Sequence, residues 1–324
     1  MNYKLSELCE YVKGKVNVEA LNSANYVSTE NMLPNKEGIV QATTLPSLGQ
    51  TQIFKSGDVL VSNIRPYFRK IWYAQFDGGC SNDVLVFRAK EGVNDRFLYY
   101  VLANDSFFDY SMATSKGTKM PRGDKSSLMK YEIRDVAYKN QDKIAEILEV
   151  LDQKIQVNKQ INDNLQQQAQ AIYKHLIVNN SQASWTPSHL SDIAIVTMGQ
   201  SPKGESYNEE GTGTIFFQGR AEFGFRFPTR RLYTTDPKRM AKANDALMSV
   251  RAPVGDMNVA YEDCCIGRGL GAIRSKDRHQ SFVLYTMFAL REQLNVFNGE
   301  GTVFGSINRD ALNSMPINIP PQEI

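Results

Sequence analysis

The sequence has few of the residues that build metal centres and disulfide frameworks. Its 324 residues include only four cysteines and three histidines. No two cysteines stand at the Cys-x-x-Cys spacing that is typical of zinc and redox motifs. We therefore expect no metal site, and we interpret these cysteines as buried or unreactive thiols: Cys9, Cys80, Cys264 and Cys265.

Familiar catalytic and nucleotide-binding motifs are also missing. The chain contains no G-x-x-x-x-G-K-[ST] phosphate loop and no H-E-x-x-H zinc motif. It also lacks the N-P-P-[YF] or D-P-P-[YF] motif that DNA amino-methyltransferases share. The glycines at 267, 269 and 271 alternate, but they fit a tight turn beside a strand better than a dinucleotide fingerprint. We predict a chain without catalytic residues and without a cofactor of its own.

Long hydrophobic runs and a strong charge of either sign are absent as well. No stretch approaches the ~20 apolar residues of a membrane span, and the N-terminus lacks the apolar core of a signal peptide, so we expect a cytoplasmic protein. The formal net charge of +2 does not by itself indicate a partner. Basic residues are concentrated in 115–130 and 220–251, where they suit phosphate contacts, although a solvated loop surface is an equally good interpretation.

The most distinctive segment that is present, residues 141–178, contains neither glycine nor proline. Its apolar residues recur at alternating steps of four and three, which is typical of a coiled-coil helix. At 1.5 Å per residue such a helix is about 57 Å long. We call the recurring positions the seam: Ile144, Leu148, Leu151, Ile155, Asn158, Asn162, Leu165, Ala169, Ile172 and Leu176.

The seam allows two interpretations of the helix. It could simply link two domains, or it could be a spacer that holds them at a set distance and offers its seam to a partner helix. The two asparagines weaken packing but specify register, because each favours a polar partner opposite it. The spacer is the interpretation we favour.

The segments on either side of the helix look like diverged copies of one unit. Asp58 aligns with Asp245, and Pro66 aligns with Pro253. Both copies end in a basic loop rich in glycine, threonine and serine. The aligned parts come in the same order in both copies: Lys4–Leu8 with His189–Ile193, 56–74 with 243–261, 80–92 with 265–277, and the helix-like 97–110 with 282–294.

Each copy has short β-branched and aromatic strands, glycine and proline turns, and one or two helices. We therefore predict an α/β fold with two mixed α+β domains in tandem, at 1–140 and 181–324, joined by the helix at 141–180. Asp58 lies 83 residues before Gln141, so the same spacing from Asp245 would start a second helix at 328, past residue 324. We expect the partner of the seam to be supplied from outside this chain.

The combination resembles the specificity (S) subunit of type I restriction-modification enzymes. The resemblance covers nearly the whole chain. It is carried by QDKIAEIL (141–148), LDQKI (151–155), NKQINDNL (158–165) and AQAIY (169–173), and by GDVLVSNIRP (57–66) and SVRAPVGD (249–256).

The resemblance implies two target-recognition domains, each reading one half of a split double-stranded DNA target, with the helices acting as a ruler. It also implies that methyltransferase subunits, which carry S-adenosylmethionine, and a restriction subunit with ATP and Mg²⁺ dock on this scaffold and supply the chemistry. Family members usually carry a second helix after the second domain. Without one, a seam left in water would forfeit on the order of 10 kcal/mol of burial free energy, so we expect pairing with a second copy or with methyltransferase helices.

Residues suited to reading DNA lie on separate segments of each domain. Arginine can read guanine and asparagine or glutamine can read adenine, whereas lysine, serine, threonine and tyrosine mostly contact phosphates. For any one of these residues, an ordinary surface charge or an ion pair within the domain is an equally good interpretation. The candidates are Asn63, Arg65, Tyr67, Arg69, Lys70, Lys116, Thr118, Lys119 and Arg122 in the first domain, and Gln218, Arg220, Arg226, Arg230, Arg231, Arg251, Arg268 and Ser306 in the second.

Because the two copies have diverged, we expect an asymmetric, bipartite target in place of the palindrome that a symmetric dimer reads. Two other functions stay open. A methyltransferase or nuclease would bind S-adenosylmethionine or cut DNA by itself. A coiled-coil adaptor without a DNA role would show binding that ignores both base sequence and salt.

Overall fold

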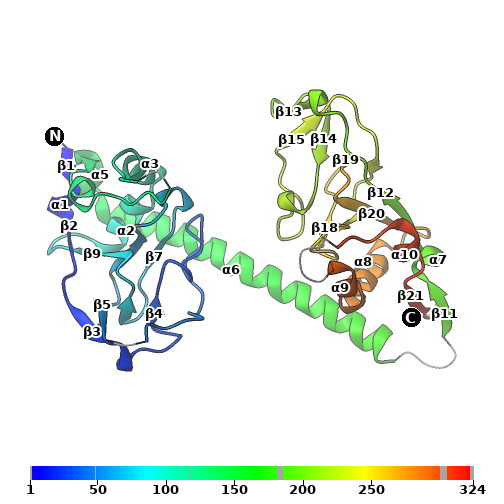
Figure 1. Ribbon diagram of the computed structural model, residues 1–324, viewed down its shortest axis with the longest axis horizontal. Helices are drawn as coiled ribbons and strands as arrows, with labels where there is room; N and C mark the ends of the chain where they lie inside the picture. Colours follow the sequence, from blue (N-terminus) through cyan, green and yellow to red (C-terminus); the bar gives the residue numbers. More distant parts are fainter. Residues whose placement is uncertain (1, 48, 118, 181–184, 300–304, 322–324) are drawn as a thin grey trace. The chain divides into compact units, whose positions relative to one another are not determined.

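The structure, a computed structural model, describes residues 2–47, 49–117, 119–180, 185–299 and 305–321. It contains two compact units, Met1–Gln160 and Ile161–Ile324, and one long helix begins in the first and ends in the second (Figure 1). The predicted fold class, two mixed α/β domains in tandem with a long helix between them in the chain, is confirmed. The division falls inside that helix, whereas we set 141–180 apart as a segment of its own, and those boundaries stay a prediction.

The first unit is built on two four-stranded sheets, and a two-stranded ladder joins its first strand to its last. Most of its α-helices follow the two sheets in the chain, whereas one short helix precedes them and the 3₁₀ turns lie between their strands. The sheets are β2 (Cys9–Tyr11)-β9 (Val84–Ala89)-β6 (Val59–Ser62)-β7 (Ile71–Tyr73) and β3 (Lys15–Asn17)-β5 (Gln50–Phe54)-β8 (Gly78–Cys80)-β4 (Tyr26–Val27), and the ladder is β1 (Asn2–Lys4)-β10 (Glu132–Arg134). The helices are α1 (Leu5–Leu8), α2 (Asp95–Ala103), α3 (Asp105–Ala113), α4 (Lys125–Leu128), α5 (Asp135–Lys139) and the 3₁₀ turns Val18–Ala20 and Pro66–Phe68.

Strand β6 divides the first unit into two hydrophobic cores. Successive side chains of a strand point to opposite faces. Val59 and Val61 accordingly join the core that contains the α2 and α3 aromatics Phe97 and Phe107, whereas Leu60 joins the core around Phe54. Every residue of β6 is buried. The loop that follows β6 therefore starts from a strand whose position is fixed by packing on both faces.

The second unit has the same plan. Its sheets are β12 (Ala194–Met198)-β20 (Leu270–Ser275)-β17 (Ala246–Ser249)-β18 (Met257–Val259) and β13 (Tyr207–Asn208)-β15 (Leu232–Thr234)-β14 (Thr214–Phe217)-β19 (Cys264–Ile266)-β16 (Met240–Ala241), and its ladder is β11 (Thr186–His189)-β21 (Pro316–Ile319). Its helices are α7 (Leu190–Ile193), α8 (Gln280–Ala289), α9 (Arg291–Asn295), α10 (Arg309–Asn313) and the 3₁₀ turns Gly204–Ser206, Arg220–Glu222 and Val296–Asn298.

The predicted duplication is confirmed by two sets of equivalent contacts. In the first unit the buried carboxylate of Asp58 accepts two hydrogen bonds from the Arg88 guanidinium, both at 2.7 Å. In the second unit Asp245 accepts the same pair from Arg274, at 2.7 and 2.8 Å. Each carboxylate also caps the turn before it, by accepting from the backbone N–H three residues earlier. These contacts raise the pKa of both arginines, mainly through the hydrogen bonds to the aspartates.

These contacts correct one part of the sequence alignment. Asp58 and Arg88 are 30 residues apart, whereas Asp245 and Arg274 are 29 apart. The loop between β6 and β7 is therefore one residue longer than the loop between β17 and β18. The overlay of 80–92 on 265–277, which matched two cysteines, is wrong by one residue, because the strands align through the arginines that hold the buried aspartates.

Helix α6 (Gln141–Tyr173) is continuous, as predicted, and a single π-helical turn, Lys174–Val178, follows it. Its first turn is fixed to the start of α2. The Gln141 side chain accepts from the Asn94 backbone at 2.8 Å, and the Asn94 amide donates to Asp142 at 2.9 Å. Further along, Arg96 forms an ion pair with Glu149 at 3.1 Å, and the Tyr100 hydroxyl donates to Asp152 at 2.9 Å.

Beyond these contacts the seam is open to solvent. Ile144 packs against the core of the first unit that contains Phe97 and Phe107. In contrast, Leu151, Ile155, Leu165 and Ile172 are 50–59% exposed. Asn158 and Asn162 are exposed as well. Four further exposed apolar residues lie outside the predicted seam and widen the apolar surface of the helix: Ile147, Val150, Val157 and Ile161.

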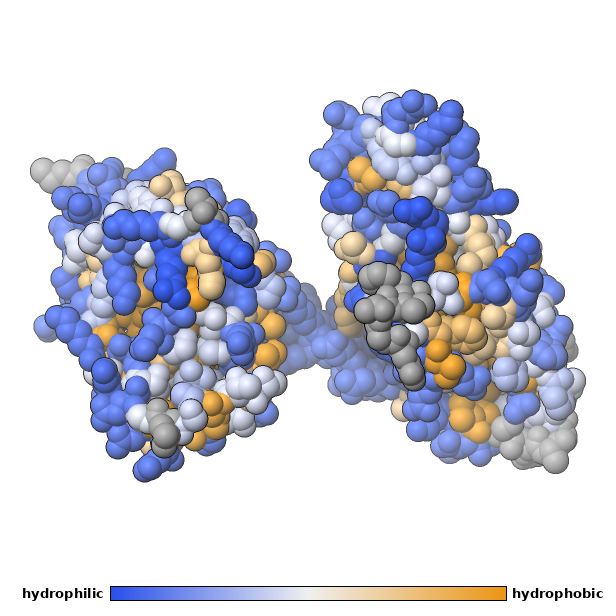
Figure 2. Space-filling model, in the orientation of Figure 1, coloured by the Kyte–Doolittle hydropathy of each residue, from blue (hydrophilic) through white to orange (hydrophobic). Residues whose placement is uncertain are grey.

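The four cysteines are free and buried, as expected. Burial raises the pKa of the Cys9, Cys80 and Cys264 thiols to about 12. In the part of the chain that the structure describes, no three potential metal ligands come together, and no helix is both long and apolar enough to span a bilayer. On the faces visible in Figure 2, hydrophobic residues gather in patches surrounded by hydrophilic ones.

Candidate nucleic-acid interface

In the first unit the structure brings the two predicted DNA-binding segments together. The loop Asn63–Lys70 leaves β6, and residues 116–122 form a second loop after α3. Backbone bonds join them: the Arg65 N–H donates to Pro121 at 2.8 Å, and the Gly123 N–H donates to Asn63 at 3.2 Å. The second loop is closed by a two-way bond between Lys116 and Arg122. We call the two loops together the first loop pair.

Several basic side chains of the first loop pair already have partners. Arg122 pairs with Asp83 at 3.1 Å, and Lys116 lies 3.7 Å from Asp124. Two others hold the base of the loop: the Arg69 guanidinium pairs with Asp105 at 3.1 Å, and the Lys70 ammonium donates to the Thr29 carbonyl at 2.6 Å. Partial burial lowers the pKa of Lys70.

The remaining candidates of the first loop pair differ in accessibility. Arg65, Tyr67 and Lys119 are exposed, and no hydrogen bond or ion pair engages their side chains among the described residues. The side-chain oxygen of Asn63 is buried without a hydrogen-bond partner there, so a two-bond contact with adenine would require the loop to move. Thr118 lies outside the described residues.

The second unit repeats this arrangement. The loop 250–256 after β17 meets residues 305–307: Arg251 and Ser306 form a β-bridge, and the Ile307 N–H donates to Val250 at 3.0 Å. The same loop contacts the turn at 267–269, because the Val250 N–H donates to Gly269. Four predicted residues therefore lie on connected segments, which we call the second loop pair: Arg251, Ser306, Arg268 and Gln218, whose carbonyl accepts from Gly269.

The other four candidates of the second unit are engaged in ion pairs or ring contacts. Arg220 pairs with Asp256 of the loop at 3.0 Å, and Arg230 pairs with Glu262 at 2.8 Å. Arg231 bonds to the buried carboxylate of Glu222 at 3.1 Å. Arg226 lies over the Phe227 ring. The ion pair of Arg231 lies within the unit and competes with a DNA-binding role. DNA binding by these four arginines stays a prediction.

A cluster of exposed aromatic rings was missed in the sequence. Phe225, Phe227 and Tyr261 are 54%, 41% and 66% exposed. The Phe227 and Tyr261 rings touch edge to face, with centroids 5.5 Å apart, and Arg230 lies over Tyr261. The interleaving of phenylalanine with arginine in GRAEFGFRFPTRR (219–231) was the available signal, because aromatic and basic residues together suit nucleic-acid stacking.

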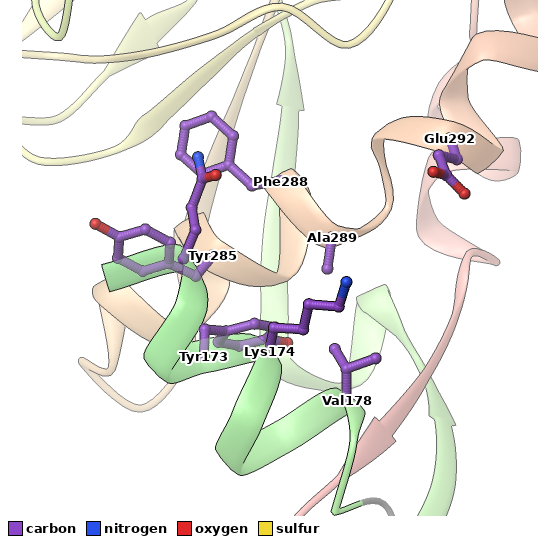
Figure 3. Close-up of a pocket in the computed structure, with 8 residues that line it drawn as sticks. Tyr173, Lys174, Val178, Tyr285, Phe288, Ala289 and Glu292 are labelled. Carbon is purple, nitrogen blue, oxygen red and sulfur yellow. The ribbon is translucent and has the colours of Figure 1, made fainter. Parts of the chain in front are cut away.

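A separate groove of about 320 Å³ lies within the second unit, between the end of α6 and α8 (Figure 3). Tyr173 fixes the helix there, because its hydroxyl lies 2.9 Å from that of Thr286 and its ring contacts Phe282. Tyr285, Phe288 and Lys174 line the groove. The groove contains none of the predicted DNA-binding residues.

Comparison with known proteins matches almost the whole chain to one family. Residues 1–167 and 182–324 match the family model of the type I restriction modification DNA specificity domain. The two matched stretches correspond to the two copies of the repeat, each with its own loop pair.

Two similar proteins carry names of the same kind. The chain is 45% identical over 130 residues to a Methanocaldococcus jannaschii protein named as the specificity subunit of the MjaX type I restriction enzyme, covering 40% of this chain and 30% of that protein. It is 26% identical over 198 residues to the HindI type I specificity subunit of Haemophilus influenzae, covering 59% of this chain and 43% of that protein. The chain thus matches less than half the length of each relative.

The fold also has a solved counterpart. The crystal structure of a type I restriction-modification S subunit from M. genitalium aligns with 98% of this chain and 84% of its own, with a TM-score of 0.62. The sequence identity is 16%, so this likeness concerns the fold alone.

Proposed function

Because the chain belongs to the family of type I restriction modification DNA specificity domains, we propose that each of its units reads one half of a divided DNA target. The repeated loop pair is the observation that carries this proposal. In both units the loop after the central buried strand is bonded to a second, distant loop, and arginine side chains lie on the joined segments. Arginine on a positioned loop can read guanine through two hydrogen bonds.

The two half-sites differ in this proposal, because the two loop pairs present different chemistry. The first presents Arg65, Tyr67 and Lys119, whereas the second presents Arg251, Arg268 and Ser306. The partner is double-stranded DNA, and the target is an asymmetric sequence with a gap.

Helix α6 has two roles in the same proposal. It sets the gap between the half-sites, and its exposed apolar residues bind helices of other subunits. The exposed seam supports the second role. Four large apolar side chains of the seam are 50–59% exposed, and exposed apolar residues grouped on one surface mark a site of protein contact. The proposed partners are the methyltransferase subunits, the restriction subunit and a second copy of this chain. S-adenosylmethionine, ATP and Mg²⁺ would bind to the catalytic partners.

The proposal is tested by co-expressing this chain with the type I methyltransferase subunit encoded beside it and sequencing the host DNA for methylated bases. We expect one asymmetric, interrupted motif to be methylated. The matched control is the methyltransferase subunit expressed alone, which should leave that motif unmodified.

Two results would contradict parts of the proposal. A palindromic motif would mean that one unit is presented twice, by two copies of the chain. Methylation of the same motif by the methyltransferase subunit alone would show that this chain does not read the DNA.

A further inference from the structure

The first loop pair carries two aromatic rings on its outer surface. Tyr67 is 50% exposed and Phe68 is 39% exposed, and their ring centroids are 4.7 Å apart. Among the described residues, no hydrogen-bond partner is found for the Tyr67 hydroxyl. We call Tyr67 and Phe68 the aromatic tip. Two adjacent exposed rings on a soluble protein indicate a contact surface more often than a structural need.

The backbone around the aromatic tip is strained. Arg65 (φ 49°, ψ 65°) and Arg69 (φ 52°, ψ 44°) both adopt the left-handed conformation, which is unfavourable for residues with a Cβ atom. Pro66, between them, is buried. Two such residues on either side of one turn direct the two rings away from the core. Strain of this kind persists where the surrounding structure enforces it, and it is concentrated at functional sites.

Backbone hydrogen bonds with two other segments enforce this geometry. The Arg65 N–H donates to Pro121, the Phe68 carbonyl accepts from Asn35 at 2.8 Å, and the Arg69 carbonyl accepts from Lys36 at 2.9 Å. The ion pair of Arg69 with Asp105 and the bond from Lys70 to Thr29 add two side-chain anchors. The aromatic tip is therefore a rigid feature, and these two cations support it from behind.

The remaining basic residues of the first loop pair lie on the loop of the aromatic tip and on the loop bonded to it. Arg65 precedes it in the same loop, and the second loop, which is bonded to Arg65, carries Lys116, Lys119 and Arg122. Two carboxylates, Asp83 and Asp124, offset part of that charge. Positive charge around exposed rings suits a polyanion with stacked bases better than an apolar protein surface.

We propose that the aromatic tip is a wedge that inserts between neighbouring base pairs of the first half-site, with Tyr67 in the stack and Phe68 behind it. This inference rests on the proposed function and changes the role of Tyr67 from a phosphate contact to a stacking contact. Apolar side chains that enter a base step unstack it, and pyrimidine–purine steps yield most easily. The first half-site accordingly contains such a step. The equivalent loop of the second unit, Arg251–Asp256, has no aromatic residue.

The test compares Tyr67→Phe with Tyr67→Ala in the full chain, in complex with its methyltransferase subunit. The probe is a duplex that holds the motif found by methylation sequencing, with 2-aminopurine placed at each step of the first half-site in turn. We expect Tyr67→Phe to bind like the wild type and Tyr67→Ala to lose affinity on the order of 10-fold. One 2-aminopurine position should brighten with the wild type and with Tyr67→Phe, but not with Tyr67→Ala.

The matched control is Val40→Ala, which shortens an apolar side chain of the first unit that is 49% exposed, against 50% for Tyr67, and that lies outside the loop pair; it should leave DNA affinity and the 2-aminopurine signal unchanged. Unfolding midpoints equal to that of the wild type would show that the variants fold. Equal losses for Tyr67→Phe and Tyr67→Ala would assign the contact to the hydroxyl and overturn the wedge.

Two further outcomes would also decide against the wedge. Unchanged DNA affinity of Tyr67→Ala, together with loss of the methyltransferase subunit on purification, would assign the aromatic tip to protein docking. A wild-type complex that binds DNA without sequence preference would overturn the proposed function itself. This failure is distinguishable from failure of the wedge, because it is seen with the wild type, before any substitution is made.

Discussion

At the scale of single residues, the two buried aspartates are the clearest structural positions in the chain. Each holds an arginine through two hydrogen bonds and caps a backbone turn, and the Asp58 and Asp245 side chains are only 2% and 3% exposed. We expect Asp58→Ala to destabilise the first unit by roughly 2–3 kcal/mol, because it leaves the turn uncapped and Arg88 unpaired. Denaturant unfolding of the full chain measures this loss.

The duplication supplies the comparison for that experiment. Asp245→Ala should cost the second unit a similar amount, and Glu91→Ala, at an exposed position, should cost almost nothing. A double variant, Asp58→Ala with Arg88→Ala, should be little less stable than Asp58→Ala alone, since the pair acts together. Additive losses would show that the two side chains stabilise the unit independently.

Arg251 gives the residue-scale prediction for DNA reading. Its loop is fixed by the bridge to Ser306, and no ion pair holds its side chain among the described residues. We expect Arg251→Ala to relax the second half-site at one position, with a loss of discrimination of about 1–3 kcal/mol, and to leave the first half-site intact.

Methylation sequencing of cells that express each variant with the methyltransferase subunit reads out both half-sites at once. Lys276→Ala, an exposed basic residue outside the loop pair, is the matched control and should leave the motif unchanged. Relaxation of the first half-site by Arg251→Ala would contradict the assignment of one half-site to each unit.

At the scale of elements, helix α6 is the proposed spacer, and its length is open to direct manipulation. Removal of residues 156–162 takes out two helical turns and shortens the helix by about 10.5 Å. We expect the gap between the half-sites to shrink by about three base pairs, at 3.4 Å per pair, while both half-sites keep their sequences. The methylated motif measures the gap. Changed half-site sequences would contradict the role of α6 as a ruler.

The exposed seam gives the second element-scale prediction. Leu165 and Ile172 are 58% and 59% exposed, so each can accept a charge without damage to the folded unit. We expect Leu165→Asp with Ile172→Asp to abolish binding of a partner helix, because a partner would have to bury two carboxylates. Sedimentation of the chain alone and with the methyltransferase subunit shows which association is lost.

Gln160→Asp with Gln167→Asp is the control for that pair of substitutions. It places two negative charges on the helix at the same seven-residue spacing, at exposed positions outside the seam. Full association of the seam double variant would show that the partners bind elsewhere.

At the scale of the whole molecule, the sequence was sufficient wherever its signal was periodic or repeated. The continuous helix from Gln141 and the duplication through Asp58 and Asp245 could both be predicted, since each depends on a local pattern. The meeting of Arg251 with Ser306 could not, because a bridge across 55 residues depends on tertiary packing. Nor could a pattern of residue types show that Arg69 and Lys70 point back into the unit.

The one-residue error in the overlay of 80–92 on 265–277 had a local physical cause. Matching Cys80 with Cys265 placed β8 and β9 one residue out of register with β19 and β20, because two buried thiols in apolar strands have no specific partner. The aspartate and arginine pairs, which require each other, define the equivalence that the structure shows.

The terminal ladders have one more consequence. In each unit a two-stranded ladder pairs a strand before the two sheets with a strand after them, β1 with β10 and β11 with β21, so the two ends of each repeated copy lie side by side. A segment with adjacent ends can be replaced as a block without rethreading the remaining chain. If each unit reads one half-site, as proposed, recombination between genes of this design would exchange one half of a recognition sequence in a single event.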